Sequence, residues 1–454
     1  MSVSDRVPDR VSAVGSSDPA KIIGLLAVIY AVYLVLGSVA GIDPVSNMTS
    51  LTRWIGLFAI AALALNLHWG YTGLFNIGVI GFMGVGVYVA AIVSKDPVAA
   101  GGGGAVGGAT GGLGLPLPIG MLAGAVAAAL FGLLVALPAL RLRADYLAIV
   151  TVAVSEIFRL SVRNGNISSF DVGGLSIGFG GGDGLQLDWG SEVELLFDAL
   201  LLGGVYDSLT ATAERLIGSP VAVDRIGYAL ILLAFMIGYY ALLQRMGNSP
   251  FGRVLKAIRE DEEATNSLGK DTDRFKIVVF MIGCGLMGLL GVLWFMNAGG
   301  GGGSINSTQF RPDTTFYIWV ALIIGGAGSN TGSVMGGALF AAVLYRGPRF
   351  LQNVIDKLTK TDLGRFARQT GFGEAMAPIA GSFDPIPLLL YTVTKLQSLQ
   401  LLIMGLVIIY LMHNRPQGLL GHRKEQAAAI SLSRPDRRSG GDRAVAADGG
   451  VEDE

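Results

Sequence analysis

Two charged residues, Glu156 and Arg159, lie inside an otherwise apolar stretch of the chain. They are three residues apart, so in a helix they share one face and can form an ion pair. A charge surrounded by lipid costs several kcal/mol unless it is paired or reached by water. The pair therefore has two interpretations. It is an ion pair near the end of a span or between helices, or Glu156 is a polar point on the path of a transported substrate.

A second group of polar side chains surrounds glycines at a junction between two apolar stretches. Tyr71 and Asn76 lie among Gly70, Gly73 and Gly78. Such a junction can be a broken helix whose exposed backbone groups bind the polar part of a substrate. The same glycines can instead allow two helices to pack closely. Under the first interpretation, Tyr71 and Asn76 join Glu156 as candidates for the substrate path.

The remaining reactive residues form no pattern typical of catalysis or metal binding. His68, His413 and His422 are widely separated, and the single cysteine, Cys284, lies in an apolar run. The glycine-rich stretch 325–332 lacks the Gly-Lys-Ser/Thr ending of a phosphate-binding loop. We therefore predict no catalytic residue, no metal site and no cofactor on this chain, and no enzymatic activity of its own.

A charged amphipathic segment, residues 249–269, lies between two apolar stretches. Ser249 is a favourable N-cap, Pro250 a favourable first helical residue and Gly269 a favourable end. An apolar stripe with helical spacing follows the cap: Phe251, Val254, Leu255 and Ile258. The pattern predicts a helix that reaches about 28 Å if it is unbroken. Its stripe must pack either against the chain's own membrane-embedded part or into a groove on a soluble partner.

Repeated apolar runs must position all of these residues. The chain is 52% hydrophobic and only 15% charged, whereas a soluble domain has about 25% charged residues. Runs of about 20 apolar residues can cross a bilayer as helices. The pattern predicts an all-α polytopic membrane protein with about ten transmembrane segments. They lie at about residues 21–40, 51–69, 74–93, 117–140, 146–163, 225–243, 275–297, 314–327, 332–346 and 396–413. The eighth and ninth are short and could form a hairpin that does not fully cross.

Basic residues orient these segments, because loops rich in Lys and Arg face the cytoplasm. The basic loops follow the fourth and sixth segments, and a basic region follows the tenth. This places both termini in the cytoplasm of a protein of the cell (plasma) membrane. The predicted parts are a cytoplasmic tail 1–20, a membrane domain 21–421 and a disordered cytoplasmic tail 422–454. Within the domain we expect an acidic external loop 164–224, a cytoplasmic loop 244–274 and an extended loop 347–395, whose basic residues conflict with an external position.

The end of the amphipathic segment carries a known motif. Glu263, Ala264 and Thr265, followed by Gly269, resemble the EAA loop of ABC importer permeases, with Thr265 where a second Ala is usual. In that superfamily the loop forms the coupling helix that docks on the ATPase subunit. The resemblance implies that the apolar stripe, Glu263, Ala264 and Gly269 form an ATPase-coupling surface.

Longer motifs resemble one branch of this superfamily, the larger, LivM-type permease of branched-chain amino acid transporters. The motifs are Gly70–Gly78 (GYTGLFNIG), Leu137–Arg159 (LPALRLRADYLAIVTVAVSEIFR), Leu322–Gly332 (LIIGGAGSNTG) and Arg415–Gly421 (RPQGLLG). They follow one another in family order from about residue 50 to 421. Asn76 departs from the family pattern, which has Ser there. The family's substrate contacts are therefore the part of the resemblance that transfers least well to this chain.

The resemblance implies a permease that moves leucine, isoleucine or valine inward. Its implied partners are two ABC ATPase subunits, a second, smaller permease subunit, an external solute-binding protein and membrane lipid, with no nucleic acid. ATP and Mg would be bound by the ATPases and not by this chain. Two alternatives stay open: a urea or short-amide permease of the same family, and an ion-coupled secondary transporter. The second would favour an intramembrane acidic relay or inverted repeats.

Overall fold

The computed structural model describes residues 18–98, 110–139, 144–187, 192–199, 202–217, 221–296, 303–359, 371–382, 386–414 and 417–420. The chain divides into two compact units, Met1–Gly421 and His422–Glu454. The predicted tail 422–454 and most of the predicted tail 1–20 lie outside the described residues.

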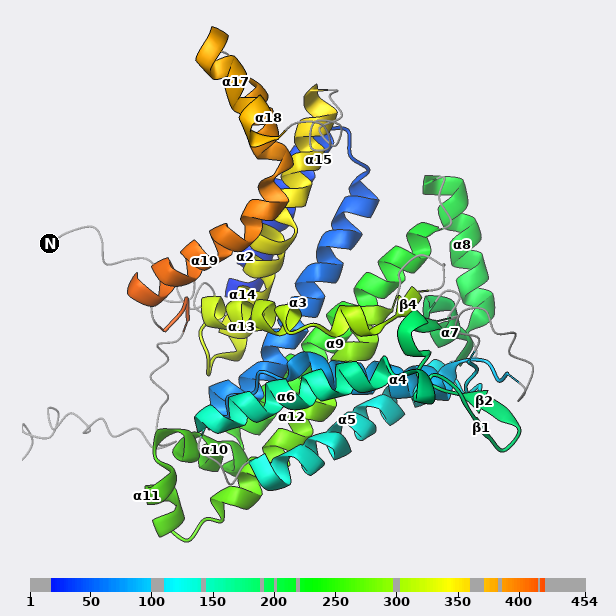
Figure 1. Cartoon of the computed structure of the whole chain (residues 1–454), viewed down its shortest axis with the longest axis vertical. Helices are drawn as coiled ribbons and strands as arrows, with labels where there is room; N and C mark the ends of the chain where they lie inside the picture. The colour runs from blue at the N-terminus through cyan, green and yellow to red at the C-terminus, as the bar shows by residue number, and fades with distance from the viewer. Residues whose placement is uncertain are drawn as a thin grey trace, which may run out of the picture. The chain divides into compact units, whose positions relative to one another are not determined.

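The first unit is built almost entirely from helices (Figure 1). They are α2 (Asp18–Val39), α3 (Pro44–Thr72), α4 (Val79–Ser94), α5 (Leu117–Ala139), α6 (Ala144–Val162), α7 (Glu192–Ala199), α8 (Gly203–Ile217), α9 (Val221–Asn248), α10 (Pro250–Glu260), α11 (Glu262–Ser267), α12 (Thr272–Phe295), α13 (Asp313–Gly325), α14 (Asn330–Leu339), α15 (Gly347–Thr359), α17 (Phe372–Ser382), α18 (Ile386–Thr394) and α19 (Leu396–Asn414). A π-helical turn, η5 (Phe340–Tyr345), continues α14.

The helices confirm the predicted all-α polytopic class. Among the described residues, α2, α3, α5, α9 and α12 are long and apolar enough to cross a membrane. The pair α13 and α14, bent by 120°, adds a sixth span if it is counted as one. The other predicted spans are shorter or more polar: α4 and the apolar part of α19 fall below 18 residues. Helix α6 carries Asp145 in addition to Glu156 and Arg159.

Helix α3 occupies the interior of this unit. It is buried over most of its length and packs against α9, α12, α13 and α14. A second packed group joins α12 to α4 and α5. Small residues bring these helices together: a methyl group added to Gly86 of α4 would overlap the backbone of Gly288 in α12. Close backbone approach of this kind is typical of membrane helices, where small residues replace the hydrophobic effect as the basis of packing.

The predicted external loop 164–224 contains ordered elements of its own. Strands β1 (Phe170–Val172) and β2 (Leu175–Ile177) form an antiparallel hairpin. Its two-residue turn, Gly173–Gly174, has positive φ at both positions, as the favoured hairpin turn requires. Strand β3 (Leu185–Leu187) pairs with β4 (Gly303–Ile305), which joins this segment to the region between α12 and α13. Helices α7 and α8 complete it.

The predicted extended loop 347–395 is also helical where the structure describes it. Helix α15 follows η5, and α17 and α18 precede α19. The side of α15 that carries Phe350 and Val354 is buried, and Phe350 stacks on Tyr33 of α2 with ring centroids 4.2 Å apart. Packing against α2 therefore holds the start of this segment in place.

Candidate functional site

The predicted connector helix begins where the sequence places it. Ser249 is the N-cap of α10: its hydroxyl oxygen accepts a hydrogen bond from the Gly252 backbone N–H at 3.2 Å. Pro250 is the first helical residue, a position at which its missing N–H costs nothing. The beginning of α10 is thus fixed by local sequence.

The helix does not run unbroken to Gly269, as the sequence pattern had allowed. It ends at Glu260 because Asp261 adopts an extended conformation, with φ −156° and ψ 107°. The Asp261 carboxylate then accepts a hydrogen bond from the Ala264 N–H at 2.9 Å and so caps α11. Acidic caps suit the positive end of a helix dipole. The segment is therefore two helices joined at one extended residue, Asp261, and not one continuous helix of about 28 Å.

The apolar stripe of α10 faces this chain's own helices. Leu255 is fully buried and Ile258 is 4% exposed. The Phe251 ring stacks on Phe275 of α12, with centroids 5.3 Å apart, and Val254 is partly buried. Of the two interpretations of the stripe, the structure shows packing against the chain's own spans, so these four side chains position α10.

The exposed part of the connector lies in α11 and the turn after it. Glu263 and Ala264 are exposed, and Leu268 is 81% exposed, which is unusual for a large apolar side chain. Gly269 has φ +76°, so it turns the chain toward α12 in a conformation that other residues rarely adopt. Glu262 anchors this end from the other side through an ion pair of 2.5 Å with Lys276 of α12.

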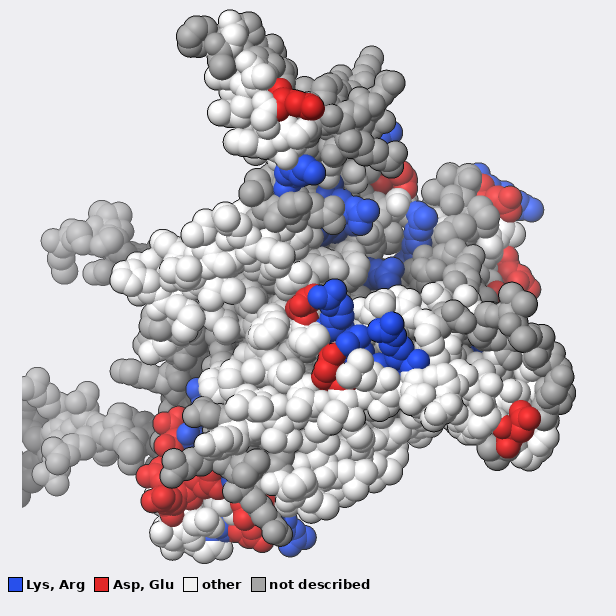
Figure 2. All heavy atoms as spheres, in the orientation of Figure 1, with Lys and Arg blue, Asp and Glu red and all other residues white. Residues whose placement is uncertain are grey.

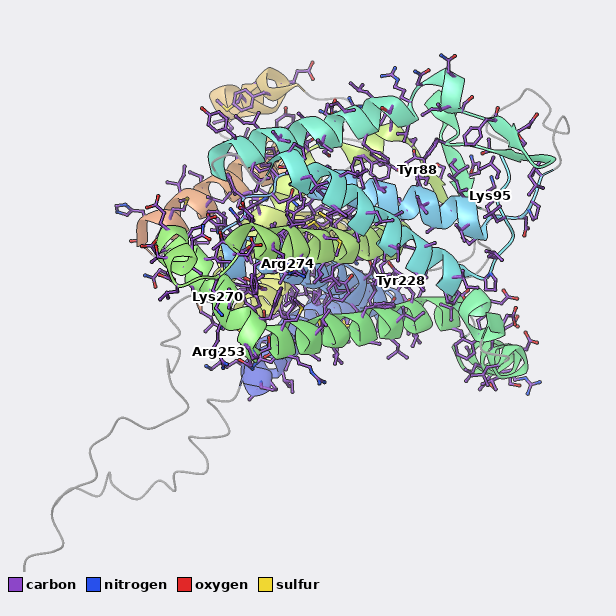
Figure 3. The ribbon with its side chains drawn as sticks, turned by 90° about the horizontal axis from the view of Figure 1, so that it is seen from below. Tyr88, Lys95, Tyr228, Arg253, Lys270 and Arg274 are labelled. Carbon is purple, nitrogen blue, oxygen red and sulfur yellow. The ribbon has the colours of Figure 1, made fainter. Side chains whose placement is uncertain are left out.

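Charged side chains gather over this end of the unit. Figure 2 shows acidic and basic groups over α10 and α11, next to a surface over α5 that carries almost none. Figure 3 places Arg253, Lys270 and Arg274 at the same end. Water-facing charge beside an uncharged wall is the distribution expected where a membrane protein leaves the bilayer.

Arg259 connects α10 to the end of α3. Its guanidinium Nη1 donates a hydrogen bond of 2.6 Å to the carbonyl oxygen of Gly70. The same nitrogen lies beside Gly328, in the bend between α13 and α14, close enough that a methyl group on Gly328 would approach it to 2.9 Å. A single side chain of the connector thus contacts both the end of α3 and the bent pair.

Asn66 joins the same two elements from inside. Its side-chain oxygen accepts a hydrogen bond of 2.7 Å from the Gly328 N–H. Its amide nitrogen donates to the Asn330 side-chain oxygen at 3.0 Å. Asn66 is fully buried, and buried polar groups in such networks are costly to leave unpaired. The residues Arg259, Gly70, Asn66, Gly328 and Asn330 are called the junction below.

Tyr71, a predicted substrate-path residue, lies at the edge of the junction. Its hydroxyl is 3.0 Å from the Asn330 side-chain oxygen and 3.1 Å from the Leu243 carbonyl oxygen of α9. Lys256 of α10 sits over its ring, 5.7 Å from the centroid. Asn330 also donates to Gln244 of α9 at 3.3 Å. Tyr71 therefore links α3, α9, α10 and the bent pair.

Asn76, the second predicted path residue, lies in a separate buried network. Its side-chain oxygen accepts from the Gly78 N–H at 2.8 Å, and its amide nitrogen is 3.2 Å from His68 Nδ1. Its backbone carbonyl accepts from Trp319 Nε1 at 3.1 Å. These bonds hold the extended link between α3 and α4, and Asn76 is fully buried within them.

Glu156, the third predicted path residue, forms the ion pair that its spacing allows. Arg159 Nε donates to Glu156 Oε2 at 2.9 Å, and a second bond of 2.5 Å joins the other nitrogen and oxygen. The Glu156 side chain is 36% exposed. Tyr71, Asn76 and Glu156 therefore have three different sets of hydrogen-bond partners. Within the described ranges, no group of His, Cys, Asp or Glu side chains could hold a metal ion.

Sequence reasoning missed the contributions of Arg259 and Asn330 to the junction. Both residues were visible, Arg259 as a charge on the connector and Asn330 within the glycine-rich turn. It also missed Arg53, an ionisable residue inside the predicted span 51–69. A charge in such a segment is by default a candidate functional residue, so that signal was present in the sequence.

The comparisons with known proteins agree on one kind of protein. Residues 47–412 match the family model described as the permease component of branched-chain amino acid transport systems. A probable branched-chain amino acid transport permease protein LivM of Methanocaldococcus jannaschii is 24% identical over 62% of this chain and 76% of its own length. The high-affinity branched-chain amino acid transport system permease proteins LivM of Salmonella typhimurium and Escherichia coli are each 29% identical over 62% of this chain. The match spans 59% of their length. No solved structure matches the chain.

Proposed function

Because the chain belongs to the permease family of branched-chain amino acid transport systems, we propose that it is the larger membrane-spanning subunit of an ABC importer. The importer moves leucine, isoleucine or valine into the cell. Its other parts are two ABC ATPase subunits, a second, smaller permease subunit and an external solute-binding protein. ATP and Mg bind to the ATPases. The chain lies in the cell membrane with both termini in the cytoplasm.

The contact between the connector and the ends of the spans carries this proposal. Glu263, Ala264 and the turn at Gly269 are exposed, so they supply the surface that docks on an ATPase. Arg259, two residues before the corner at Asp261, bonds to Gly70 of α3 and lies beside Gly328. A displacement of α11 by the ATPase is therefore transmitted to α3 and to the bent pair α13 and α14.

Transport follows from a difference between two states of this arrangement. An ATPase can shift the equilibrium between outward-open and inward-open states only by as much as it binds one of them better. Leu255 and Ile258 of α10 are buried against the spans. Because this packing fixes α10, a force applied to α11 moves the spans with it. Of the path candidates, Tyr71 and Asn76 hold the end of α3 and its link to α4, and Tyr71 lies next to α10. Glu156 pairs with Arg159 within α6.

Reconstituted uptake tests the proposed activity directly. The complete complex in proteoliposomes, given the binding protein and ATP, accumulates labelled leucine, and uptake stops without either addition. Accumulation of urea in place of leucine supports the amide alternative. Uptake by the isolated chain without ATP, driven by an ion gradient, overturns the importer assignment.

Two variants of exposed residues test the docking surface. Ala264→Arg places a long charged side chain on α11 without disturbing an internal contact, because Ala264 is exposed. We expect it to lower co-purification with the ATPases and to abolish ATP-driven uptake. The control is Ser208→Arg on α8, which is also exposed and belongs to the predicted external segment. Equal assembly and uptake by both variants contradicts docking at α11.

Arg259→Gln separates docking from transmission. The variant keeps α11 intact but removes the charged donor to Gly70. It should still assemble with the ATPases and hydrolyse ATP, while uptake per ATP falls. Unchanged uptake per ATP shows that the bond at Gly70 transmits nothing.

A further inference from the structure

A small polar cleft lies where α3 and α9 begin. Its volume is about 230 Å³, and its lining residues are Ser46, Thr49, Ser50 and Arg53 of α3 with Arg225 and Tyr228 of α9. Figure 3 shows Tyr228 on α9 away from the end at which Arg253, Lys270 and Arg274 gather. In the proposed orientation, the cleft therefore faces the exterior.

The cleft is positively charged. Two of its lining residues are arginines, and among the described residues that line it none is acidic. Two acids stand close to the lining residues in sequence, and both are hydrogen-bonded: Asp224 accepts from the Tyr206 hydroxyl at 2.7 Å. Asp43 accepts from the Ser46 N–H at 2.8 Å. The lining itself therefore presents two cationic side chains, Arg53 and Arg225, to an anionic group from outside.

Two aromatic rings hold the Arg53 side chain in position, and its guanidinium keeps an N–H donor that is not paired by any described residue. Its guanidinium lies over the rings of Trp54 and Tyr228, 5.5 and 5.7 Å from their centroids. One nitrogen makes a long contact of 3.4 Å to the Met296 carbonyl oxygen. Its Nε is buried and has no hydrogen-bond partner within the described part of the chain. A buried unsatisfied donor on a charged group is costly, and an arginine fork matches a carboxylate with two parallel bonds.

The hydroxyl groups around the arginines offer oxygen acceptors. Thr49 donates its proton to the Val45 carbonyl oxygen at 2.7 Å. Tyr228 donates its proton to the Leu293 carbonyl oxygen at 2.5 Å. Since the Thr49 proton is directed to backbone, its oxygen presents lone pairs, whereas the Tyr228 side chain is buried. An ammonium group next to a bound carboxylate finds an acceptor in Thr49.

We propose that this cleft binds the carboxylate of an aliphatic α-amino acid at the external entrance, with Arg53 and Arg225 as its binding residues. The volume suits a small zwitterion and not a large solute. The assignment rests on the proposed import function, because it names the part of the substrate that this chain recognises. The phosphate of a lipid head group has related anionic oxygens, and the experiment distinguishes the two.

Thermal unfolding of the full purified chain measures binding without any partner. Cys284 is the single cysteine and is fully buried, so a fluorogenic maleimide reports its exposure on heating. Leucine and 4-methylpentanoate, which both carry a carboxylate, should raise the unfolding temperature. Leucinamide, which lacks it, should not. Arg53→Gln and Arg225→Gln should lose the effect, while Arg215→Gln, an exposed charge on α8, should keep it.

Uptake by the complete complex supplies the second measurement. Loss of charge-assisted bonds worth about 1.5–3 kcal/mol predicts at least a tenfold fall in leucine uptake for Arg53→Gln and Arg225→Gln. Leucine uptake by Arg53→Lys, which keeps the positive charge but not the two parallel N–H donors, should lie between that of these variants and that of the wild type. If ATP-driven leucine uptake is normal in all of these variants, the cleft assignment fails and the import function stands.

The remaining outcomes are also decisive. If the wild type shows no ATP-driven leucine uptake but carboxylates still stabilise it through Arg53, the import function fails and the carboxylate site stands. If phosphatidylglycerol stabilises the chain relative to phosphatidylcholine and carboxylates do not, the cleft is a lipid site and the proposal is overturned. If Arg53→Gln fails to fold, the same two measurements on Arg225→Gln and Arg53→Lys test the cleft assignment.

Discussion

The buried amide of Asn66 provides the sharpest test of the junction. Replacing it with leucine keeps a side chain of similar size but removes both hydrogen bonds. The Gly328 N–H loses its acceptor at 2.7 Å. The Asn330 side-chain oxygen loses one donor but keeps Tyr71 within reach at 3.0 Å. Only the Gly328 N–H is therefore left without a partner.

The size of the effect follows from these two losses. An unsatisfied, partly buried N–H costs about 1–3 kcal/mol, and the lost bond to Asn330 adds about 1 kcal/mol. The sum, about 2–4 kcal/mol, is opposed by the apolar area that leucine adds, which is small because the site is already filled by an amide of similar size. We expect Asn66→Leu to shift the unfolding equilibrium at least tenfold toward the unfolded chain.

Maleimide labelling of Cys284 during heating measures this shift in detergent. Helix α12, which carries Cys284, packs against α3, so the probe reports loss of the structure that the junction supports. The matched control, Asn248→Leu, removes an exposed amide at the end of α9 and should change stability by less than about 0.5 kcal/mol. If Asn66→Leu unfolds at the same temperature as this control, the junction contributes no stability and the reasoning is refuted.

Two further predictions concern helix packing. Gly86→Ala should destabilise the chain by about 1–3 kcal/mol through overpacking, because the added methyl overlaps Gly288. Gly238→Ala, which meets no atom within 4 Å, should not, and equal melting of the two would contradict the packing. For α3 and α9, a Cβ added to Gly56 lies 3.1 Å from that of Leu232. A cysteine pair there should cross-link after a small shift and block uptake until it is reduced; uptake through an intact cross-link would show that these helices do not move apart.

The sequence predicted the membrane class well, because apolar runs of span length are determined locally. It predicted the beginning of α10 for the same reason, since Ser249 and Pro250 act on their own helix. The bounds of the spans were predicted less well, because hydropathy alone does not show where a helix stays regular: the predicted span 74–93 is α4, Val79–Ser94. The bend of 120° between α13 and α14 agrees with the hairpin that the glycine-rich stretch 325–332 allows, because Gly326 and Gly328 adopt positive φ there.

The sequence around Asp261 is compatible both with a new helix N-terminus and with a continuous helix. An acidic residue followed by Glu262, Glu263 and Ala264 is typical of a helix N-terminus, yet the same residues also suit the middle of an exposed helix. The contacts of Arg259 and Asn66 could not be predicted, because each joins residues far apart in the chain. The pairing of β3 with β4 has the same origin: its register is set by the folded helices between them.

The cleft and the junction are built on the same two helices, and this has an energetic consequence. Helix α3 supplies Arg53 to the cleft and Asn66 to the junction, about 20 Å apart at 1.5 Å per residue. Helix α9 supplies Tyr228 to the cleft and Gln244, which accepts a hydrogen bond from Asn330 of the junction. A shift of α3 along α9 changes both sites together, so occupancy of one must bias the other by an equal coupling free energy. If leucine in the cleft tightens the hold of the ATPases on α11, the ATPases must tighten the cleft for leucine by the same factor. If cleft occupancy leaves that affinity unchanged, the shared pair of helices carries no coupling, however well each site works alone.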